Sequence, residues 1–172
     1  MLLGATLAMI GSYFAIKWQF AEAHKKEQQR AALLFRHLAS EQKRLIGKLL
    51  DIDESVRTPG MVDLFSRQIS ANYSCFNENY DAIALIPGPD VRADIADTFR
   101  SFADLMDILN REFYSLSDIS VTKLKYAENS PNAIAANKRI YEIRGQIREM
   151  FDQIKSFKAK FSSIEKKVKP DG

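Results

Sequence analysis

Apolar side chains recur along the chain in steps of three and four residues, the spacing of one face of an α-helix. The series is most regular over residues 133–168, where eleven apolar positions form a heptad seam. Similar series cover residues 95–116, 62–83 and, more loosely, 34–52. Only residues 119–122 alternate apolar and polar side chains with period two. The pattern therefore predicts an all-α protein whose phenylalanines pack in the core.

Proline, glycine and polar residues divide these series. The breaks lie at residues 58–60, at residues 87–89 and over a looser stretch of about 118–130. Proline stops a helix in its interior but is favoured in the first turn, where its missing N–H costs nothing. We therefore expect new helices after the breaks, with N-caps at Thr58, Asp90 and Ser130.

The helix lengths and connections predict an antiparallel, up-down four-helix bundle over residues 22–170, because short connections favour antiparallel neighbours. The expected helices cover residues 22–55, 59–86, 90–117 and 131–168. The sequence does not show whether the heptad seam of the last helix packs inside one bundle or pairs with another chain.

The N-terminal segment is uncharged over residues 1–16. Sixteen helical residues rise about 24 Å, whereas the hydrocarbon core of a bilayer is about 30 Å thick. Continuing the helix to Ala21 closes this difference if the amine of Lys17 reaches the headgroups. We expect a transmembrane anchor over residues 1–21 that continues directly into the bundle. The side chains expected to hold it in the membrane are Leu2, Leu3, Leu7, Ile10, Phe14, Ile16 and Trp18.

Two other interpretations of this segment remain open. Residues 21–23, Ala-Glu-Ala, resemble a signal-peptidase site, which would make the segment a cleaved signal peptide. A buried core helix is the other interpretation. The basic residues that follow the segment place the bundle in the cytoplasm by the positive-inside rule. Signal cleavage would instead leave it periplasmic or secreted.

Small side chains recur every four residues within the anchor, at Gly4, Ala8 and Ser12. Such a face allows two membrane helices to approach closely. We therefore note it as a candidate association face.

Charge is unevenly distributed, although the net charge is only +3, from 25 basic and 22 acidic residues. Four aspartates share one face of the third helix and form a candidate docking face: Asp90, Asp94, Asp97 and Asp104. Six lysines in the last helix are candidates for contact with anionic lipid: Lys155, Lys158, Lys160, Lys166, Lys167 and Lys169. Simpler interpretations are that the acidic helix complements its basic neighbours and that the lysines form a solvated helix end.

Catalytic and metal-binding signatures do not appear in the sequence. One cysteine, Cys75, excludes a disulfide framework, and two histidines, His24 and His37, leave little material for a metal site. No phosphate-binding loop, nucleophile elbow or zinc motif is present. We expect no enzyme activity, no cofactor, no small-molecule substrate and no nucleic-acid partner.

The combined features predict a membrane-anchored, non-catalytic helical bundle that acts in protein–protein interaction. It would be a scaffold or accessory subunit whose partners are membrane lipid and a protein or a second copy of itself. The alternative is a sensory or signal-transduction module, in which a four-helix bundle transmits helix shifts from a ligand site to an output.

Overall fold

The structure, a computed structural model, describes residues 2–168, with side chains described for residues 12–54 and 56–168. All regular secondary structure in this part of the chain is helical, which confirms the all-α class. The elements are α1 (Leu2–Leu50), the 3₁₀-helix η1 (Glu54–Val56), α2 (Pro59–Glu78), the 3₁₀-helix η2 (Tyr80–Leu85), α3 (Pro89–Lys123) and α4 (Pro131–Lys167).

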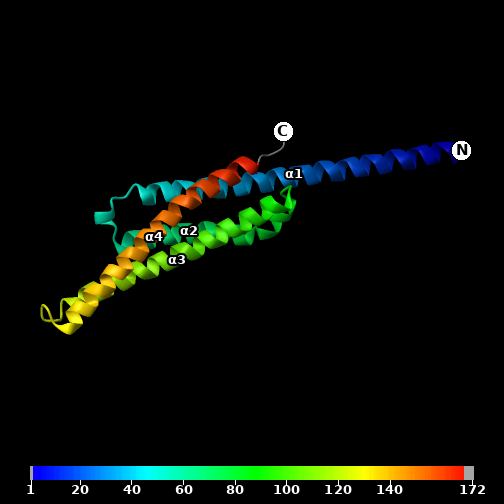
Figure 1. The fold of residues 1–172 in the computed structure, drawn as a ribbon. Helices are drawn as coiled ribbons and strands as arrows, with labels where there is room; N and C mark the ends of the chain where they lie inside the picture. Colours follow the sequence, from blue (N-terminus) through cyan, green and yellow to red (C-terminus); the bar gives the residue numbers. More distant parts are fainter. Residues whose placement is uncertain (1, 169–172) are drawn as a thin grey trace.

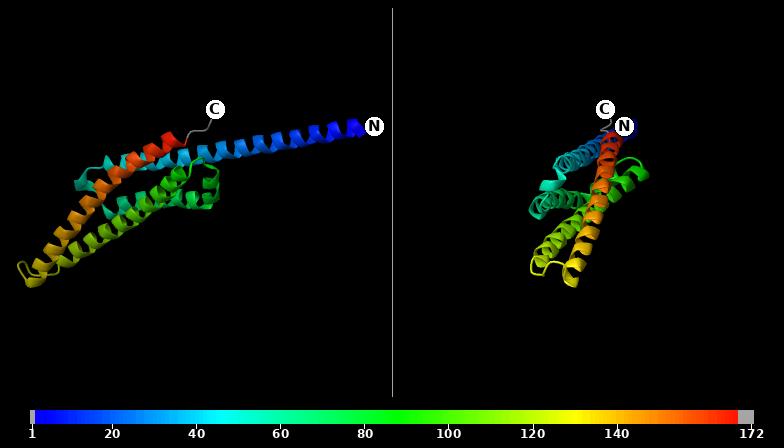
Figure 2. Two further views of the ribbon diagram at one scale, coloured as in Figure 1. Left: turned by 45° about the vertical axis from the view of Figure 1, so that its right-hand side comes forward. Right: turned by 60° about the vertical axis from the view of Figure 1, so that its left-hand side comes forward.

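The four long helices reverse direction one after another (Figure 1). Helix α1 packs against α2 and α4, and α3 packs against the same two helices from the other side. Two parts project from this body. The N-terminal half of α1 extends well beyond the other helices, and the α3–α4 hairpin extends past the α1–α2 connection at the opposite end (Figures 1 and 2).

Two of the three predicted N-caps are confirmed. The hydroxyl of Thr58 accepts a hydrogen bond from the backbone N–H of Met61 at 3.3 Å, and the hydroxyl of Ser130 accepts one from Ala133 at 3.2 Å. The predicted cap at Asp90 is wrong, because α3 begins one residue earlier, after Gly88. Gly88 has φ = 87°, a left-handed conformation that glycine adopts without steric cost and that directs Pro89 into the first turn.

Several helix ends differ from the expected ones. Helix α1 ends at Leu50 rather than at residue 55, and α2 ends at Glu78, before η2. The side-chain amide of Asn79 donates to the carbonyl of Cys75 at 2.8 Å and so satisfies one of the free carbonyls at the end of α2. Helix α3 continues to Lys123, so the short alternating stretch at residues 119–122 is helical. Ile119 packs against the core here, and the hydroxyl of Ser120 donates to the carbonyl of Leu116 at 2.7 Å.

The core is centred on phenylalanines from all four long helices, as the seam pattern predicts. The ring of Phe76 in α2 stacks on Phe99 in α3 with centroids 4.6 Å apart, and Phe35 in α1 meets Phe76 edge-on at 6.0 Å. Phe161 in α4 meets Phe99 and Phe102 edge to face, with ring centres 5.1 and 5.4 Å apart. These contacts join the helices into one hydrophobic core.

The seam of α4 is used inside the molecule. From Ile143 to Val168 its positions are buried against α1 and α3, except Met150, which is half-buried. Near the hairpin tip, Ala136 and Ile140 are only half-buried. The open question about this seam is therefore answered in favour of intramolecular packing over most of its length.

The projecting part of α1 has exposed side chains throughout residues 12–27, and Ala31 is the first buried residue of the described part of this helix. Within the part of the chain that the structure describes, no helix combines the length and apolar character needed to cross a bilayer. The expected transmembrane span is therefore not supported.

Candidate functional site

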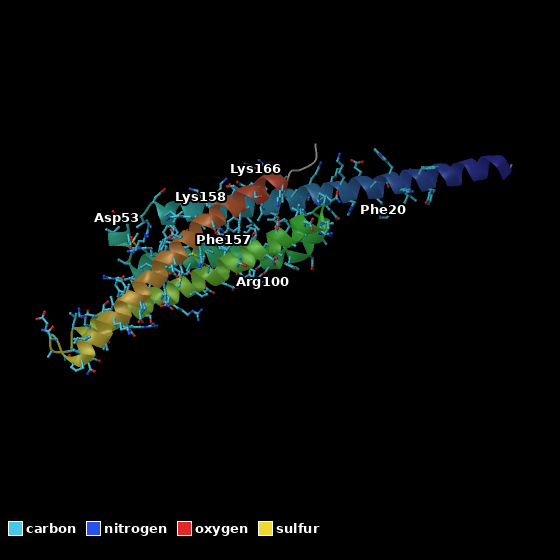
Figure 3. The ribbon with its side chains drawn as sticks, in the orientation of Figure 1. Phe20, Asp53, Arg100, Phe157, Lys158 and Lys166 are labelled. Carbon is cyan, nitrogen blue, oxygen red and sulfur yellow. The ribbon has the colours of Figure 1, made fainter. Side chains whose placement is uncertain are left out.

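The projecting half of α1 exposes a group of large apolar side chains. They are Tyr13, Phe14, Ile16, Trp18 and Phe20, each more than half exposed, with Trp18 at 69% and Phe20 at 73% (Figure 3 labels Phe20). Among the other residues assigned to the anchor, the side chains of Leu2, Leu3, Leu7 and Ile10 lie outside those described. The same holds for Gly4 and Ala8 of the candidate association face, whereas Ser12 is exposed.

Polar residues separate this apolar segment from the bundle. Glu22 and Lys26 form an ion pair at 3.0 Å across one helical turn, and the side chain of Gln28 hydrogen-bonds His24 at 3.2 Å. Residues 21–27 therefore form an exposed helical spacer, which rises about 10 Å between the apolar segment and the bundle.

The lysines of α4 do not form one face. Lys167 pairs with Asp94 of α3 at 2.5 Å, and Lys155 pairs with Asp152 at 2.6 Å. The ammonium of Lys160 lies 4.6 Å from the ring centre of Phe157. Lys158 instead points toward α1, where its Nζ lies near Gly47. Lys166 is exposed and Lys169 lies outside the described residues (Figure 3 labels Lys158 and Lys166).

The end of α4 also lies far from the apolar segment along α1. Its Glu165 forms an ion pair with Lys43 of α1. Lys43 follows Lys17 by 26 residues, which corresponds to about 39 Å along a helix. Electrostatic attraction to a membrane surface falls off within a Debye length of about 8 Å. The α4 lysines would therefore contact lipid only if α1 lay along the membrane surface.

The acidic face of α3 lies beside the basic end of α4. Asp94 pairs with Lys167, and Asp94 and Asp97 line a shallow groove of about 230 Å³ together with Lys160. Asp90 and Asp104 are exposed. Asp94 and Asp97 thus complement the basic end of α4. This favours charge complementarity between neighbouring helices over a docking face at these two positions.

The α3–α4 hairpin exposes apolar side chains that the sequence analysis missed. They are Tyr114, Val121, Leu124, Ile134 and Tyr141, with Leu124 at 83% and Tyr141 at 81% exposed. A signal was present in the sequence. Tyr114 and Val121 are seven residues apart and lie off the α3 seam, and Ile134 and Tyr141 repeat this spacing off the α4 seam.

Titratable groups are not gathered into a reactive cluster in the described residues, where no three His, Cys, Asp or Glu side chains lie close enough to hold a metal ion. Cys75 is a half-buried free thiol. The carboxylate of Glu41 accepts two hydrogen bonds from the Arg44 guanidinium, at 2.7 and 3.0 Å. This contact lowers the pKa of the Glu41 carboxyl below its ordinary value.

Comparison with known proteins identifies no relative: no protein-family profile, no curated protein and no solved structure matches the chain.

Proposed function

We propose that the protein is a non-catalytic helical-bundle protein that attaches to a membrane through its N-terminal segment and acts in protein–protein interaction. Its role would be that of a scaffold or an accessory subunit of a membrane-associated complex. The bundle would lie on the cytoplasmic side, as the basic residues after the apolar segment favour.

One observation carries this proposal: the apolar part of α1 continues past the bundle and keeps its large side chains exposed. Soluble monomers rarely expose contiguous apolar surface of this kind, and such surface is typical of a membrane or protein contact. Tyrosine and tryptophan are enriched where lipid meets water, which suits Tyr13 and Trp18.

The arrangement suits tethering. The polar spacer of residues 21–27 would hold the bundle away from the lipid, and the α3–α4 hairpin would extend farther still. Its exposed side chains, among them Leu124 and Tyr141, are the candidate surface for a protein partner. Attachment to a membrane would raise the local concentration of the bundle for a partner in the same membrane.

The only tryptophan of the chain, Trp18, offers a direct test of membrane attachment. Full-length protein is mixed with vesicles of neutral or anionic lipid, and its emission and its flotation with the vesicles are measured. We expect a blue shift and flotation with both lipids. Phe14→Asp with Ile16→Asp should abolish both signals, whereas Arg139→Gln on the exposed face of α4 should leave them unchanged.

The vesicle experiment also tests the alternative. A blue shift that appears without vesicles and grows with protein concentration would show that the segment pairs with a second copy. Absence of flotation would overturn membrane attachment.

The interaction role is tested by the native mass of the full-length protein, gently extracted from its own membranes. A mass that corresponds to a stoichiometric assembly with other chains would support the subunit role. A mass of a monomer or homodimer alone would contradict it.

A sensory or signalling module is the second candidate, and the continuity of α1 favours it. This helix runs unbroken from Leu2 to Leu50, so a rotation or shift at its N-terminus would reach the core. Inserting one alanine after Ala23 rotates the two halves by about 100°. A tether would tolerate this insertion, whereas a signalling helix would not. Assembly of the protein with its partner complex is measured to test the tether. The signalling response is measured to test the module.

A further inference from the structure

A cavity of about 640 Å³ opens where the α1–α2 connection meets the base of the α3–α4 hairpin. Its walls come from Leu50 at the end of α1, the connection itself, and the facing sides of α3 and α4. Asp53, labelled in Figure 3, marks this connection at the end of the bundle away from the N-terminus. The volume lies within the range of about 300–1,000 Å³ that is typical of small-molecule sites.

The inner wall of the cavity is apolar. Phe113 of α3 and Phe151 of α4 meet edge to face, with ring centres 6.4 Å apart. Leu50, Leu116 and Ile147 complete this wall. An alkyl or aryl group placed here would be transferred out of water. It would then contact side chains that already belong to the edge of the core.

The rim of the cavity is predominantly basic. It carries Arg57, Arg144, Arg148 and Lys155 against Glu54 and Asp152. Two of these cations have acidic neighbours: Arg148 lies 3.7 Å from Glu54, and Lys155 lies 2.6 Å from Asp152. The excess of positive charge therefore rests on Arg57 and Arg144.

These two arginines differ in how they are held. The Nε of Arg57 donates to the backbone carbonyl of Ile52 at 3.0 Å, and its guanidinium carbon lies 3.9 Å from the ring centre of Phe151. Arg57 is thereby oriented over the apolar wall. Arg144 has no ion pair or hydrogen bond to another described residue, and it is exposed at the mouth of the cavity.

We infer that this cavity binds a small amphipathic carboxylate, in which an anionic head is joined to an alkyl or aryl body. Guanidinium groups recognise carboxylates through paired N–H donors, and the apolar wall accepts the body of the ligand. The position argues for a dissolved ligand rather than a bilayer lipid. Leu50 follows Lys17 by 33 residues, about 50 Å along α1.

The inference is independent of the proposed membrane attachment, so each fails or holds by its own experiment. The probe is 4-phenylbutanoate, and the matched control ligand is 4-phenylbutylammonium, which has the same apolar body and the opposite charge. Binding is measured by titration calorimetry on the full-length protein, in nanodiscs with empty nanodiscs as the blank, or in plain buffer if the protein is soluble there.

We expect 4-phenylbutanoate to bind with a dissociation constant below about 1 mM and the ammonium compound to bind at least about tenfold more weakly. Arg144→Gln should weaken carboxylate binding about tenfold, and Arg144→Gln combined with Arg57→Gln should weaken it further. Arg139→Gln, which removes a similar charge from the same helix outside the cavity, should not change it.

Arg144 is exposed, so thermal unfolding of Arg144→Gln should match that of the parent protein, which separates lost binding from lost folding. The double variant also loses the contacts of Arg57 with Ile52 and Phe151, so its circular dichroism is recorded to show that the helices remain folded. Equal binding of the two ligands would overturn the inference, since an apolar surface alone would then explain it. Carboxylate binding that survives the double substitution, or that falls equally with Arg139→Gln, would overturn it as well.

Discussion

Phe99 of α3 connects the aromatic side chains of α2 and α4. It stacks on Phe76 of α2, meets Phe161 of α4 edge to face, and is almost completely buried. A cavity at this position would interrupt the contacts of three helices at once.

We therefore expect Phe99→Ala to lower the free energy of unfolding by about 3–5 kcal/mol, through lost burial and the cavity left behind. Urea unfolding followed by circular dichroism measures this change. The matched control, Tyr141→Ala at the exposed hairpin, should change the unfolding free energy by no more than about 0.5 kcal/mol. Similar losses for both variants would contradict the placement of the core.

Gln42 is a buried polar residue on the otherwise apolar buried face of α1. Its amide nitrogen donates to the carbonyl of Ile69 at 3.3 Å, while its amide oxygen is buried without a hydrogen-bond partner among the described residues. Gln42 is not one of the apolar positions from which the core is predicted, so the sequence predicts neither its burial nor its incomplete hydrogen bonding.

Gln42→Met should therefore change the free energy of unfolding by less than about 1 kcal/mol or raise it, because methionine fills the same space without a buried unpaired oxygen. Gln42→Ala, which leaves a cavity, should lower it by about 2 kcal/mol or more. The same urea unfolding experiment compares the two. A large loss with Gln42→Met would show that the amide is essential to the α1–α2 contact.

At the scale of the elements, the helix starts are local events that the sequence largely determines. Thr58 and Ser130 each precede a proline and cap the helix that follows. The start of α3 depends on the positive φ of Gly88, which is a feature of the turn rather than of a capping side chain.

Thr58→Ala and Ser130→Ala should each lower the free energy of unfolding by about 1 kcal/mol, since each leaves a helix N–H group without its acceptor. Thr122→Ala, near the end of α3, is the control and should have little effect. Thermal and urea unfolding of the three variants test this expectation. Unchanged stability in both cap variants would show that water replaces the hydroxyls.

At the scale of the whole molecule, α1 belongs to two environments. From Ala31 onward it is covered by its neighbours, whereas residues 12–27 have no such cover. Helices without tertiary contacts are marginally stable in water, because most helical stability in proteins comes from packing.

Hydrogen exchange should divide α1 accordingly. Amides of residues 12–27 should exchange with an opening free energy near zero in buffer, whereas those between Ala31 and Leu49 should approach the global value. Adding vesicles should protect residues 12–20 and leave the polar part of the spacer unprotected. Uniform protection along α1 in buffer would contradict this division and point to pairing of the projecting helices.

The spacing of side chains along the chain is enough to predict the class of the fold, most of the core and two of the three caps. Heptad spacing and N-capping are local properties, set by side chains a few residues apart, so they can be read along one segment. The apolar character of the N-terminal segment can be read in the same way.

The packing of the helices against one another determines how the surfaces are combined. It separated the α4 lysines among α1, α3 and their own helix, and it placed them far along α1 from the apolar segment. It also joined Arg57 to Phe151 and Arg144 across one cavity and left the off-seam residues of the hairpin exposed. These features depend on where helices cross and diverge, which follows from the packing of residues far apart in the chain.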